Sequence, residues 1–160
     1  MDREVRYEGK MFDVALRRGY EVVEHGPAVA VVPVGDGHVT LVRQERVAAG
    51  GTLLELPAGG IEDGESALET AQRELREETG LYGGDWVEVA SFFTTPGFVD
   101  EKMHLFIATG LQRGEPDPEG SEELELVRVP LDEVPSLVEE IEDAKTLIGL
   151  LFLLRSAQAG

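Results

Sequence analysis

The stretch that decides the fold is Gly59–Leu81, which reads GGIEDGESALETAQRELREETGL. Its second part has the pattern of a helix, because Ser66 followed three residues later by Glu69 fits a capping box and Gly80 supplies a C-terminal stop. The apolar face of this helix is expected to consist of Ala67, Leu68, Ala71 and Leu75. We therefore predict a loop followed by a helix that packs against a sheet.

Three glutamates gather on another face of this predicted helix. Because each helical residue advances by about 100°, Glu74, Glu77 and Glu78 fall within roughly 100° of arc. Like charges at this spacing destabilise a helix by about a few tenths of a kcal/mol per pair, and we expect Arg73 to pair instead with Glu69 one turn back. Such a carboxylate cluster suits Mg²⁺ or Mn²⁺ that bridges substrate phosphates. From the helix alone, an exposed glutamate-rich surface is the alternative interpretation.

The composition of the whole chain limits the classes of protein that remain. With 160 residues, 42% of them hydrophobic and 29% charged, residues 1–160 are expected to form one soluble globular domain. Fourteen basic and 32 acidic residues give a net charge of −18, which argues against a nucleic-acid partner. The absence of cysteine excludes thiolate catalysis and agrees with a reducing compartment. Met1–Glu4 lacks the apolar stretch of a signal peptide and Leu147–Leu154 is too short to span a bilayer, so we expect a cytoplasmic protein without a membrane partner.

Strand patterns lie on both sides of the predicted helix. The apolar run Ala28–Val34 is typical of a strand buried on both faces, and the turn at residues 35–37 predicts a hairpin with His38–Arg43. The remaining expected elements are strands at Met11–Leu16, Tyr20–Glu24, Trp86–Phe93, Lys102–Thr109 and Leu124–Val129, and helices at Leu131–Glu140 and Ala144–Ser156. This mixture indicates an α/β or α+β sandwich in which helices cover a mixed sheet.

The complete spacing within Gly59–Leu81 resembles the signature of the Nudix family. It runs Gly59, five residues, Glu65, seven residues, Arg73-Glu74-Leu75, one residue, Glu77-Glu78, one residue and Gly80-Leu81, so every defined position is filled. Nine fixed positions across 23 residues make a chance match negligible. The resemblance implies a Nudix hydrolase with an α/β/α sandwich, a mixed β-sheet and an N-terminal β-hairpin. Within the signature, Glu65 would mainly brace the loop.

The resemblance to the Nudix family also implies roles for individual residues. Glu74 and Glu78 are expected to be metal ligands, and Glu77 a ligand or a catalytic carboxylate. The backbone carbonyl of Ala58 is a further implied ligand, and Arg73 would take part in catalysis by orienting the glutamates. Two or three Mg²⁺ ions, or Mn²⁺ in their place, are the implied cofactors.

Features outside the signature resemble the ADP-ribose pyrophosphatase branch of the family. The lead-in Glu55–Gly59 (ELPAG) is similar to that of the branch, and Pro96 lies 15 residues beyond Leu81, where the branch carries a proline. The branch implies hydrolysis of ADP-ribose to AMP and ribose 5-phosphate. The alternatives are hydrolysis of another nucleoside diphosphate sugar, a dinucleoside polyphosphate or an oxidised nucleotide, and a non-catalytic module that senses a nucleotide.

Substrate contacts are implied by the same resemblance. The stretch 95–98 with Glu101 resembles the substrate loop of the branch, which assigns contacts to Gly97, Phe98 and Glu101. Arg43 lies in Val42-Arg43-Gln44, which matches the strand whose arginine contacts the substrate. The alternative interpretations are a simple turn at Pro96 and a surface charge at Arg43. His25, His38 and His104 match no metal-binding spacing, and Trp86 is expected in the core, with stacking on adenine as the alternative.

Two further expectations concern a loop and the N-terminus. Related enzymes often take a catalytic glutamate from the loop that corresponds to Glu119–Glu125, where Glu122 is the closest match, Glu123 is the alternative and a disordered acidic loop is the structural interpretation. The branch commonly forms homodimers in which N-terminal strands complete the site of the partner. Here residues 1–24 would be the dimerisation segment, with Met11–Glu24 exchanged and Glu21 reaching across.

Overall fold

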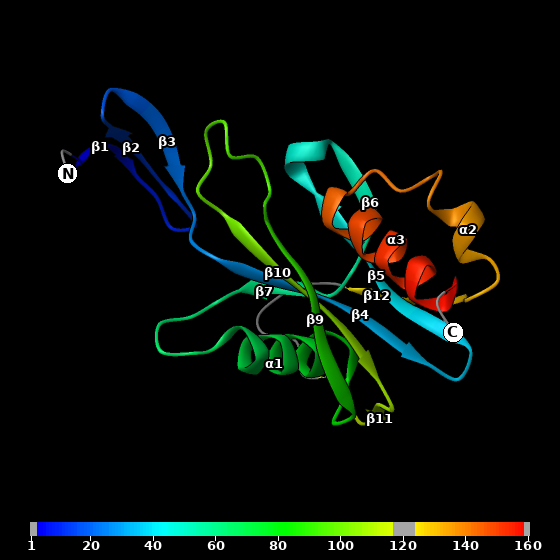
Figure 1. Cartoon of the computed structure of the whole chain (residues 1–160). Coiled ribbons are helices and arrows are strands. Elements are labelled where there is room, and N and C mark those ends of the chain that lie inside the picture. Colours follow the sequence, from blue (N-terminus) through cyan, green and yellow to red (C-terminus); the bar gives the residue numbers. More distant parts are fainter. Residues whose placement is uncertain (1–2, 117–123, 159–160) are drawn as a thin grey trace.

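The computed structural model describes residues 3–116 and 124–158, and in it helices cover both faces of a mixed sheet (Figure 1). The strands are β1 Arg3–Glu8, β2 Asp13–Arg17, β3 Tyr20–Glu24, β4 Ala28–Gly35, β5 His38–Arg46, β6 Gly51–Glu55, β7 Ala58–Gly60, β8 Leu81–Tyr82, β9 Asp85–Phe93, β10 Lys102–Thr109, β11 Gln112–Arg113 and β12 Glu125–Pro130. The helices are α1 Ala67–Thr79, α2 Val134–Leu137 and α3 Ala144–Gln158, and η1 Val47–Ala49 is a 3₁₀ turn.

The main sheet has the strand order β12-β5-β4-β10-β9, with β6 paired to β5 and β7 paired to β4. β10 runs parallel to β4, whereas the other pairs of this sheet are antiparallel. α1 lies on one face, and α2 and α3 lie on the other (Figure 1). The predicted α/β/α sandwich with a mixed sheet is therefore confirmed.

Strand β4 separates two hydrophobic cores. Its side chains alternate between the faces, so that Val29 and Val31 pack with α1, while Ala30 and Val32 pack with α3. Both sets are fully buried. This confirms the prediction of a strand buried on both faces and explains its continuous apolar sequence.

Helix α1 begins and ends as its sequence predicts. The side chain of Ser66 accepts a hydrogen bond from the backbone N–H of Glu69, and the Ser66 N–H donates to the Glu69 carboxylate at 2.8 Å. Gly80 ends the helix in the left-handed conformation with φ of 74°. One prediction is wrong: Leu68 is exposed and does not belong to the apolar face, because the buried positions of α1 begin at Thr70.

The N-terminal strands form a small antiparallel sheet at one end of the molecule, in the order β1-β2-β3 (Figure 1). The predicted hairpin is β2–β3, and it turns at Arg18 and Gly19, both with positive φ. Strand β1 was not expected, since only two of its residues, Val5 and Tyr7, are apolar, which is too short an alternation to predict a strand. The hairpin of the prediction is therefore extended by a third strand.

The C-terminal helices differ in how well the pattern predicts them. α3 follows the predicted range, and Gly149 lets it approach the sheet, because a β-carbon there would collide with Leu56. α2 is a single short turn rather than the predicted helix at 131–140.

Trp86 packs edge-on against Phe106 at 6.3 Å between ring centroids, as expected for a packing residue. No helix within residues 3–116 and 124–158 is long and apolar enough to cross a membrane.

Candidate active site

The candidate site is built where α1 lies against the short strand β7. β7 pairs with β4, so that Ala58 lies opposite Ala30 and Gly59 opposite Val29. The carboxylate of Glu74 lies in the space that a β-carbon on Gly59 would occupy. Only glycine at position 59 therefore allows Glu74 to lie against the backbone next to Ala58. This steric requirement explains why the signature begins with a glycine.

Arg73 is the centre of the polar contacts on α1. Its Nε and Nη2 donate to the two carboxylate oxygens of Glu65 at 3.0 and 3.1 Å. Its Nη1 donates to Glu74 at 2.9 Å and to Glu77 at 3.1 Å. The predicted pairing of Arg73 with Glu69 is wrong, because the Glu69 side chain bonds back to the N-cap of the helix. The hydrogen bonds that Arg73 donates to Glu65 raise the pKa of Arg73, which keeps its charge fixed.

Glu65 joins the loop to the helix. Besides the paired bonds from Arg73, it accepts a hydrogen bond at 2.8 Å from the hydroxyl of Thr70, which is fully buried. These two donors, Arg73 first, lower the pKa of Glu65 and keep it a carboxylate. Its contacts agree with the role implied by the resemblance, that of bracing the loop.

The donor set fits a hard divalent cation. Glu74, Glu77 and Glu78 supply carboxylates from one helix, Oε2 of Glu78 is buried, and Ala58 supplies a carbonyl from the adjacent strand. In the conformation described for residues 3–116 and 124–158, no group of three or more acidic or histidine side chains converges closely enough to hold an ion. Glu74 and Glu77 are instead held side by side, because each accepts a hydrogen bond from Nη1 of Arg73.

A buried ion-pair network anchors the segment that leads to Ala58. Glu55, the last residue of β6, is 1% exposed and accepts paired bonds from Arg46 at 2.7 and 2.8 Å and a bond from Lys145 at 2.6 Å. The next backbone N–H, that of Leu56, donates to the hydroxyl of Thr146 at 2.8 Å. Burial raises the pKa of Glu55, but the hydrogen bonds from Arg46 and Lys145 outweigh burial and the pKa is lowered.

One signal for this network is present in the sequence. A glutamate inside the apolar piece Leu53–Leu56 must be buried, and a buried carboxylate requires cationic partners. The pattern did not identify those partners, since Lys145 and Thr146 lie 90 residues further along the chain. Sequence reasoning therefore missed Arg46, Lys145 and Thr146.

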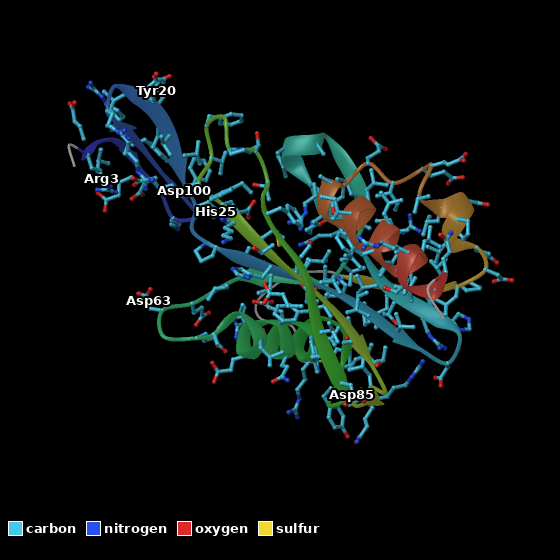
Figure 2. All side chains as sticks on the ribbon, viewed as in Figure 1. Arg3, Tyr20, His25, Asp63, Asp85 and Asp100 are labelled. Atoms are coloured by element: carbon cyan, nitrogen blue, oxygen red, sulfur yellow. The ribbon has the colours of Figure 1, made fainter. Side chains whose placement is uncertain are left out.

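The predicted substrate loop and the start of the signature loop are both bonded to residues 25–27, just before β4. Asp100 accepts hydrogen bonds from the backbone N–H groups of His25 and Gly26. The carbonyl of the following Pro27 accepts a bond at 3.0 Å from the N–H of Ile61, at the start of the loop before α1. Figure 2 shows Asp100 and His25 between the N-terminal sheet and this loop, which carries Asp63. The structure thus brings the substrate loop and the signature to the same end of the sheet.

Within the substrate loop, the predicted contact residues are accessible. Gly97 and Phe98 are exposed, and Glu101 is partly buried with its carboxylate 3.3 Å from Nδ1 of His25. Glu21 is an exposed residue of β3, opposite Leu16 of β2, in the N-terminal sheet. These positions leave the predicted contacts open to a ligand.

Arg43 lies elsewhere. It pairs with Glu125 at 3.2 Å and lines an open cleft of about 590 Å³ with residues of β6, β12 and the α2 region. None of the described residues that line this cleft belongs to α1 or β7, so Arg43 does not share the cleft with the carboxylates of α1. Glu122 and Glu123 lie outside the described residues.

The histidines take part in local contacts. Nδ1 of His38 is 2.7 Å from the carbonyl of Asp36, and Nδ1 of His104 is 2.7 Å from the carboxylate of Glu88. Each contact is made with a residue of the adjoining turn or of the neighbouring strand.

Known proteins resemble this chain over most of its length. Residues 24–149 match the profile of the NUDIX domain. The chain is 38% identical to an ADP-ribose pyrophosphatase from Bacillus subtilis (strain 168), with 94% of this chain and 89% of that protein covered. It is also 38% identical to a methanol dehydrogenase activator from Bacillus methanolicus, with 88% and 81% covered. A crystal structure of an ADP compounds hydrolase superposes with a TM-score of 0.86 at 26% identity, covering 99% of this chain and 93% of that one. The chain therefore belongs to the Nudix family of hydrolases.

Proposed function

We propose that this Nudix hydrolase cleaves the pyrophosphate bond of ADP-ribose and releases AMP and ribose 5-phosphate. The observation that carries the proposal is the cluster of Glu74, Glu77 and Glu78 on α1, in which Arg73 bonds to Glu74 and Glu77 and the carboxylate of Glu74 lies against the backbone of Gly59. The names of the relatives support the substrate, since one is an ADP-ribose pyrophosphatase and another an ADP compounds hydrolase.

The proposed cofactor is Mg²⁺, with two or three ions bound and Mn²⁺ as a substitute. Ala58, through its carbonyl, and the carboxylates of Glu74, Glu77 and Glu78 would hold these ions. When bound, divalent ions neutralise the diphosphate and lower the pKa of a water molecule. This neutralisation matters here, because a chain with a net charge of −18 otherwise repels an anionic substrate.

The side chains of the protein divide the remaining tasks. Arg73 holds Glu74 and Glu77 in place through its bonds at 2.9 and 3.1 Å. A carboxylate must position or deprotonate the attacking water, and we assign this role to Glu122, with Glu123 or Glu77 as the alternative. The attack occurs at one phosphorus and the bond to the bridging oxygen breaks.

Substrate binding is assigned to the loop between β9 and β10 and to two residues outside it. Phe98 is 56% exposed and offers an aromatic face to a base or a ribose. Gly97 offers backbone atoms and Glu101 a carboxylate acceptor for ribose hydroxyls. We retain Arg43 and Glu21 as further substrate contacts, although Arg43 lines a cleft that the carboxylates of α1 do not line.

We further propose a homodimer formed through the N-terminal sheet. Its large apolar side chains are exposed in the single chain: Val5, Tyr7, Met11, Phe12 and Tyr20. Exposed apolar groups of this number on one small sheet are typical of a surface that another protein covers. A second copy would bury them and could bring Glu21 towards the site of the partner.

The proposal is tested by incubating the purified chain with ADP-ribose and Mg²⁺, with and without EDTA, and identifying the products by chromatography. AMP and ribose 5-phosphate are expected only in the presence of metal. The Glu74→Gln variant serves as a matched control and should lose this activity. Cleavage of another nucleoside diphosphate sugar or a dinucleoside polyphosphate, without cleavage of ADP-ribose, would correct the substrate. Binding of nucleotides without any turnover would favour a sensing module instead.

A further inference from the structure

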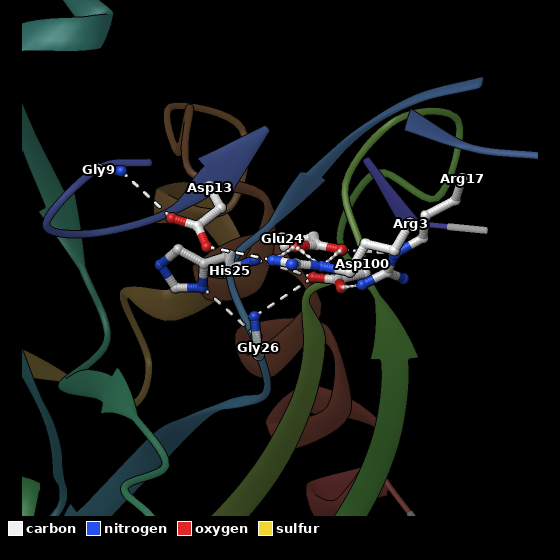
Figure 3. A network of polar contacts seen from close by, with 8 residues as sticks. All are labelled: Arg3, Gly9, Asp13, Arg17, Glu24, His25, Gly26 and Asp100. Atoms are coloured by element: carbon white, nitrogen blue, oxygen red, sulfur yellow. Dashed lines mark hydrogen bonds and ion pairs between the residues drawn. The ribbon is translucent and has the colours of Figure 1, made fainter. Parts of the chain in front are cut away.

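Asp100 connects three parts of the chain through one carboxylate (Figure 3). Its Oδ1 accepts hydrogen bonds from the backbone N–H groups of His25 at 2.9 Å and Gly26 at 3.3 Å, in the connection between β3 and β4. Its Oδ2 accepts a bond at 2.9 Å from Nη2 of Arg17 on β2. The carboxylate therefore fixes the end of the substrate loop both to the main sheet and to the N-terminal sheet.

Backbone hydrogen bonds place the loop beside β3. The N–H of Val23 donates to the carbonyl of Phe98 at 2.7 Å, and the N–H of Asp100 donates to the carbonyl of Val23 at 3.1 Å. Val23 and Val99 form a parallel bridge between them. The exposed Phe98 is thus presented from a segment whose backbone is held by the N-terminal sheet.

The contact continues to β1 as a chain of alternating charges. Glu24 accepts bonds from Arg3 at 2.6 Å and from Arg17 at 2.7 Å, and Arg17 also bonds to Asp100 (Figure 3). Hydrogen bonds from Arg3 and Arg17 lower the pKa of Glu24, and they outweigh burial, which acts in the opposite direction. Glu24 is therefore charged at neutral pH. A displacement of the N-terminal sheet would be transmitted through Arg17 to Asp100.

The same short connection also holds residues 58–61, which contain Ala58 and which we call the metal-binding segment because of the proposed role of Ala58. The carbonyl of Pro27 accepts a bond from the N–H of Ile61, while the two residues before Pro27 donate to Asp100. Residues 25–27 therefore form a common anchor for the substrate loop on one side and the start of the signature loop on the other. The spacing between the two loops depends on this anchor.

We propose that Asp100 is a positioning residue, which holds the substrate loop in a fixed position relative to the metal-binding segment. Arg17 then couples the position of this loop to the position of the N-terminal sheet. The inference rests on the proposed function, because it takes residues 95–101 as the loop that binds ADP-ribose. Asp100 touches no substrate in this role. Its loss should weaken substrate binding while the carboxylates of α1 stay in place.

The test compares steady-state kinetics of Asp100→Ala, Asp100→Asn and Arg17→Met with the unaltered chain. Asp100→Ala should raise the KM for ADP-ribose by about tenfold or more, with kcat within about threefold and the Mg²⁺ dependence unchanged. Asp100→Asn keeps an acceptor for His25 and Gly26, so its effect on KM should be smaller. Arg6→Gln is the matched control, because Arg6 forms an exposed ion pair with Glu4 on the same sheet.

Amide hydrogen exchange supplies a second measurement that does not depend on turnover. In Asp100→Ala, exchange at His25, Gly26 and residues 98–100 should accelerate, while the amides of α1 keep their protection. An unchanged KM with unchanged exchange would overturn the inference, as would a fall in kcat with KM unaltered.

The two proposals fail in different ways. If the unaltered chain does not cleave ADP-ribose, the proposed function fails, and the exchange measurement alone then decides the role of Asp100. Faster exchange confined to the loop and its anchor would still support positioning by Asp100. Uniformly faster exchange across the chain would show general destabilisation and would overturn it.

Discussion

The carboxylate of Glu74 lies where a β-carbon on Gly59 would be. The two residues come from different elements, β7 and α1, and their contact joins the glycine of the signature to the first glutamate of the cluster. The atoms that a side chain at position 59 would meet are the far end of a flexible side chain rather than backbone. A substitution there would displace the carboxylate while leaving the strand in place.

We therefore expect Gly59→Ala to separate activity from stability. The free energy of unfolding should change by less than about 1 kcal/mol, because alanine also restricts the unfolded chain. Metal affinity should fall by about 10- to 100-fold, since the carboxylate of Glu74 must leave its position. Calorimetric Mn²⁺ titration and urea unfolding measure the two effects. Gly60→Ala is the control, because a β-carbon at Gly60 meets nothing within 4 Å; equal losses in both variants would contradict the explanation.

Arg73→Lys should disorder the carboxylate cluster although the positive charge is kept. Lysine cannot reproduce the paired bonds to Glu65 together with those to Glu74 and Glu77. Metal affinity is expected to fall by about 10- to 100-fold, as for other residues that orient ligands. Arg76→Lys is the matched control. Arg76 is on the same helix as Arg73, but its guanidinium lies over the ring of Tyr82 in β8. Normal Mn²⁺ binding by Arg73→Lys would show that charge alone is sufficient.

The sequence could predict those parts of the fold that depend on neighbouring residues. The ends of α1 follow from Ser66 and Gly80, whose capping is local. Helical spacing accounts for the bond from Arg73 to Glu77, an i,i+4 pair, but not for the bonds to Glu65, because a loop turns Glu65 towards Arg73. A helical pattern cannot predict an ion pair whose geometry depends on how a loop folds.

Contacts between distant segments were beyond prediction for the same reason. Asp100 is joined to residues about 75 positions earlier, and no periodicity relates them. Strand β1 has only two apolar residues, the exposed Val5 and Tyr7, so its hydrophobic alternation was too short to predict a strand. The signature identified the glutamates of the candidate site, whereas the residues that support the site come from the fold.

A dimer through the N-terminal sheet should be abolished by placing charges on its apolar surface. Met11 is 77% and Tyr20 76% exposed in the single chain, so Met11→Asp and Tyr20→Asp together should leave the fold intact. Sedimentation should give a dimer for the unaltered chain and a monomer for the double variant. Val87→Asp, at a position of β9 that is 60% exposed, should remain dimeric. A monomeric unaltered chain at working concentration would remove the dimer proposal.

Glu122→Gln should lower kcat by about 10²- to 10⁴-fold if Glu122 acts on the attacking water. The neighbouring Glu123→Gln carries the same change in charge and should stay close to the unaltered rate. Single-turnover hydrolysis of ADP-ribose measures the effect. A loss in Glu123→Gln alone would transfer the role by one residue, and full activity in both would assign the base to Glu77.

Glu55→Gln should destabilise the fold in a manner that depends on pH. Burial raises and hydrogen bonds from Arg46 and Lys145 lower the pKa of Glu55, with a net decrease from its ordinary value of 4.5. A lowered pKa means that the charged carboxylate stabilises the fold above its unfolded pKa, and that this contribution is lost as the pH falls through the folded pKa. Near pH 7, Glu55→Gln should therefore cost about 3 kcal/mol, because Arg46 and Lys145 lose their buried partner.

Urea unfolding from about pH 7 down to about pH 3 tests this dependence. The difference between the unaltered chain and Glu55→Gln should be constant above about pH 5 and should shrink at lower pH. Only the difference isolates Glu55, because the pKa values of Glu24, Glu65 and Glu69 are lowered as well and their titration destabilises both proteins in acid. Glu139→Gln, at an exposed position, should unfold like the unaltered chain. If the difference persisted undiminished in acid, the stabilisation by Glu55 would not depend on its charge, and the ion pairs with Arg46 and Lys145 would not be its source.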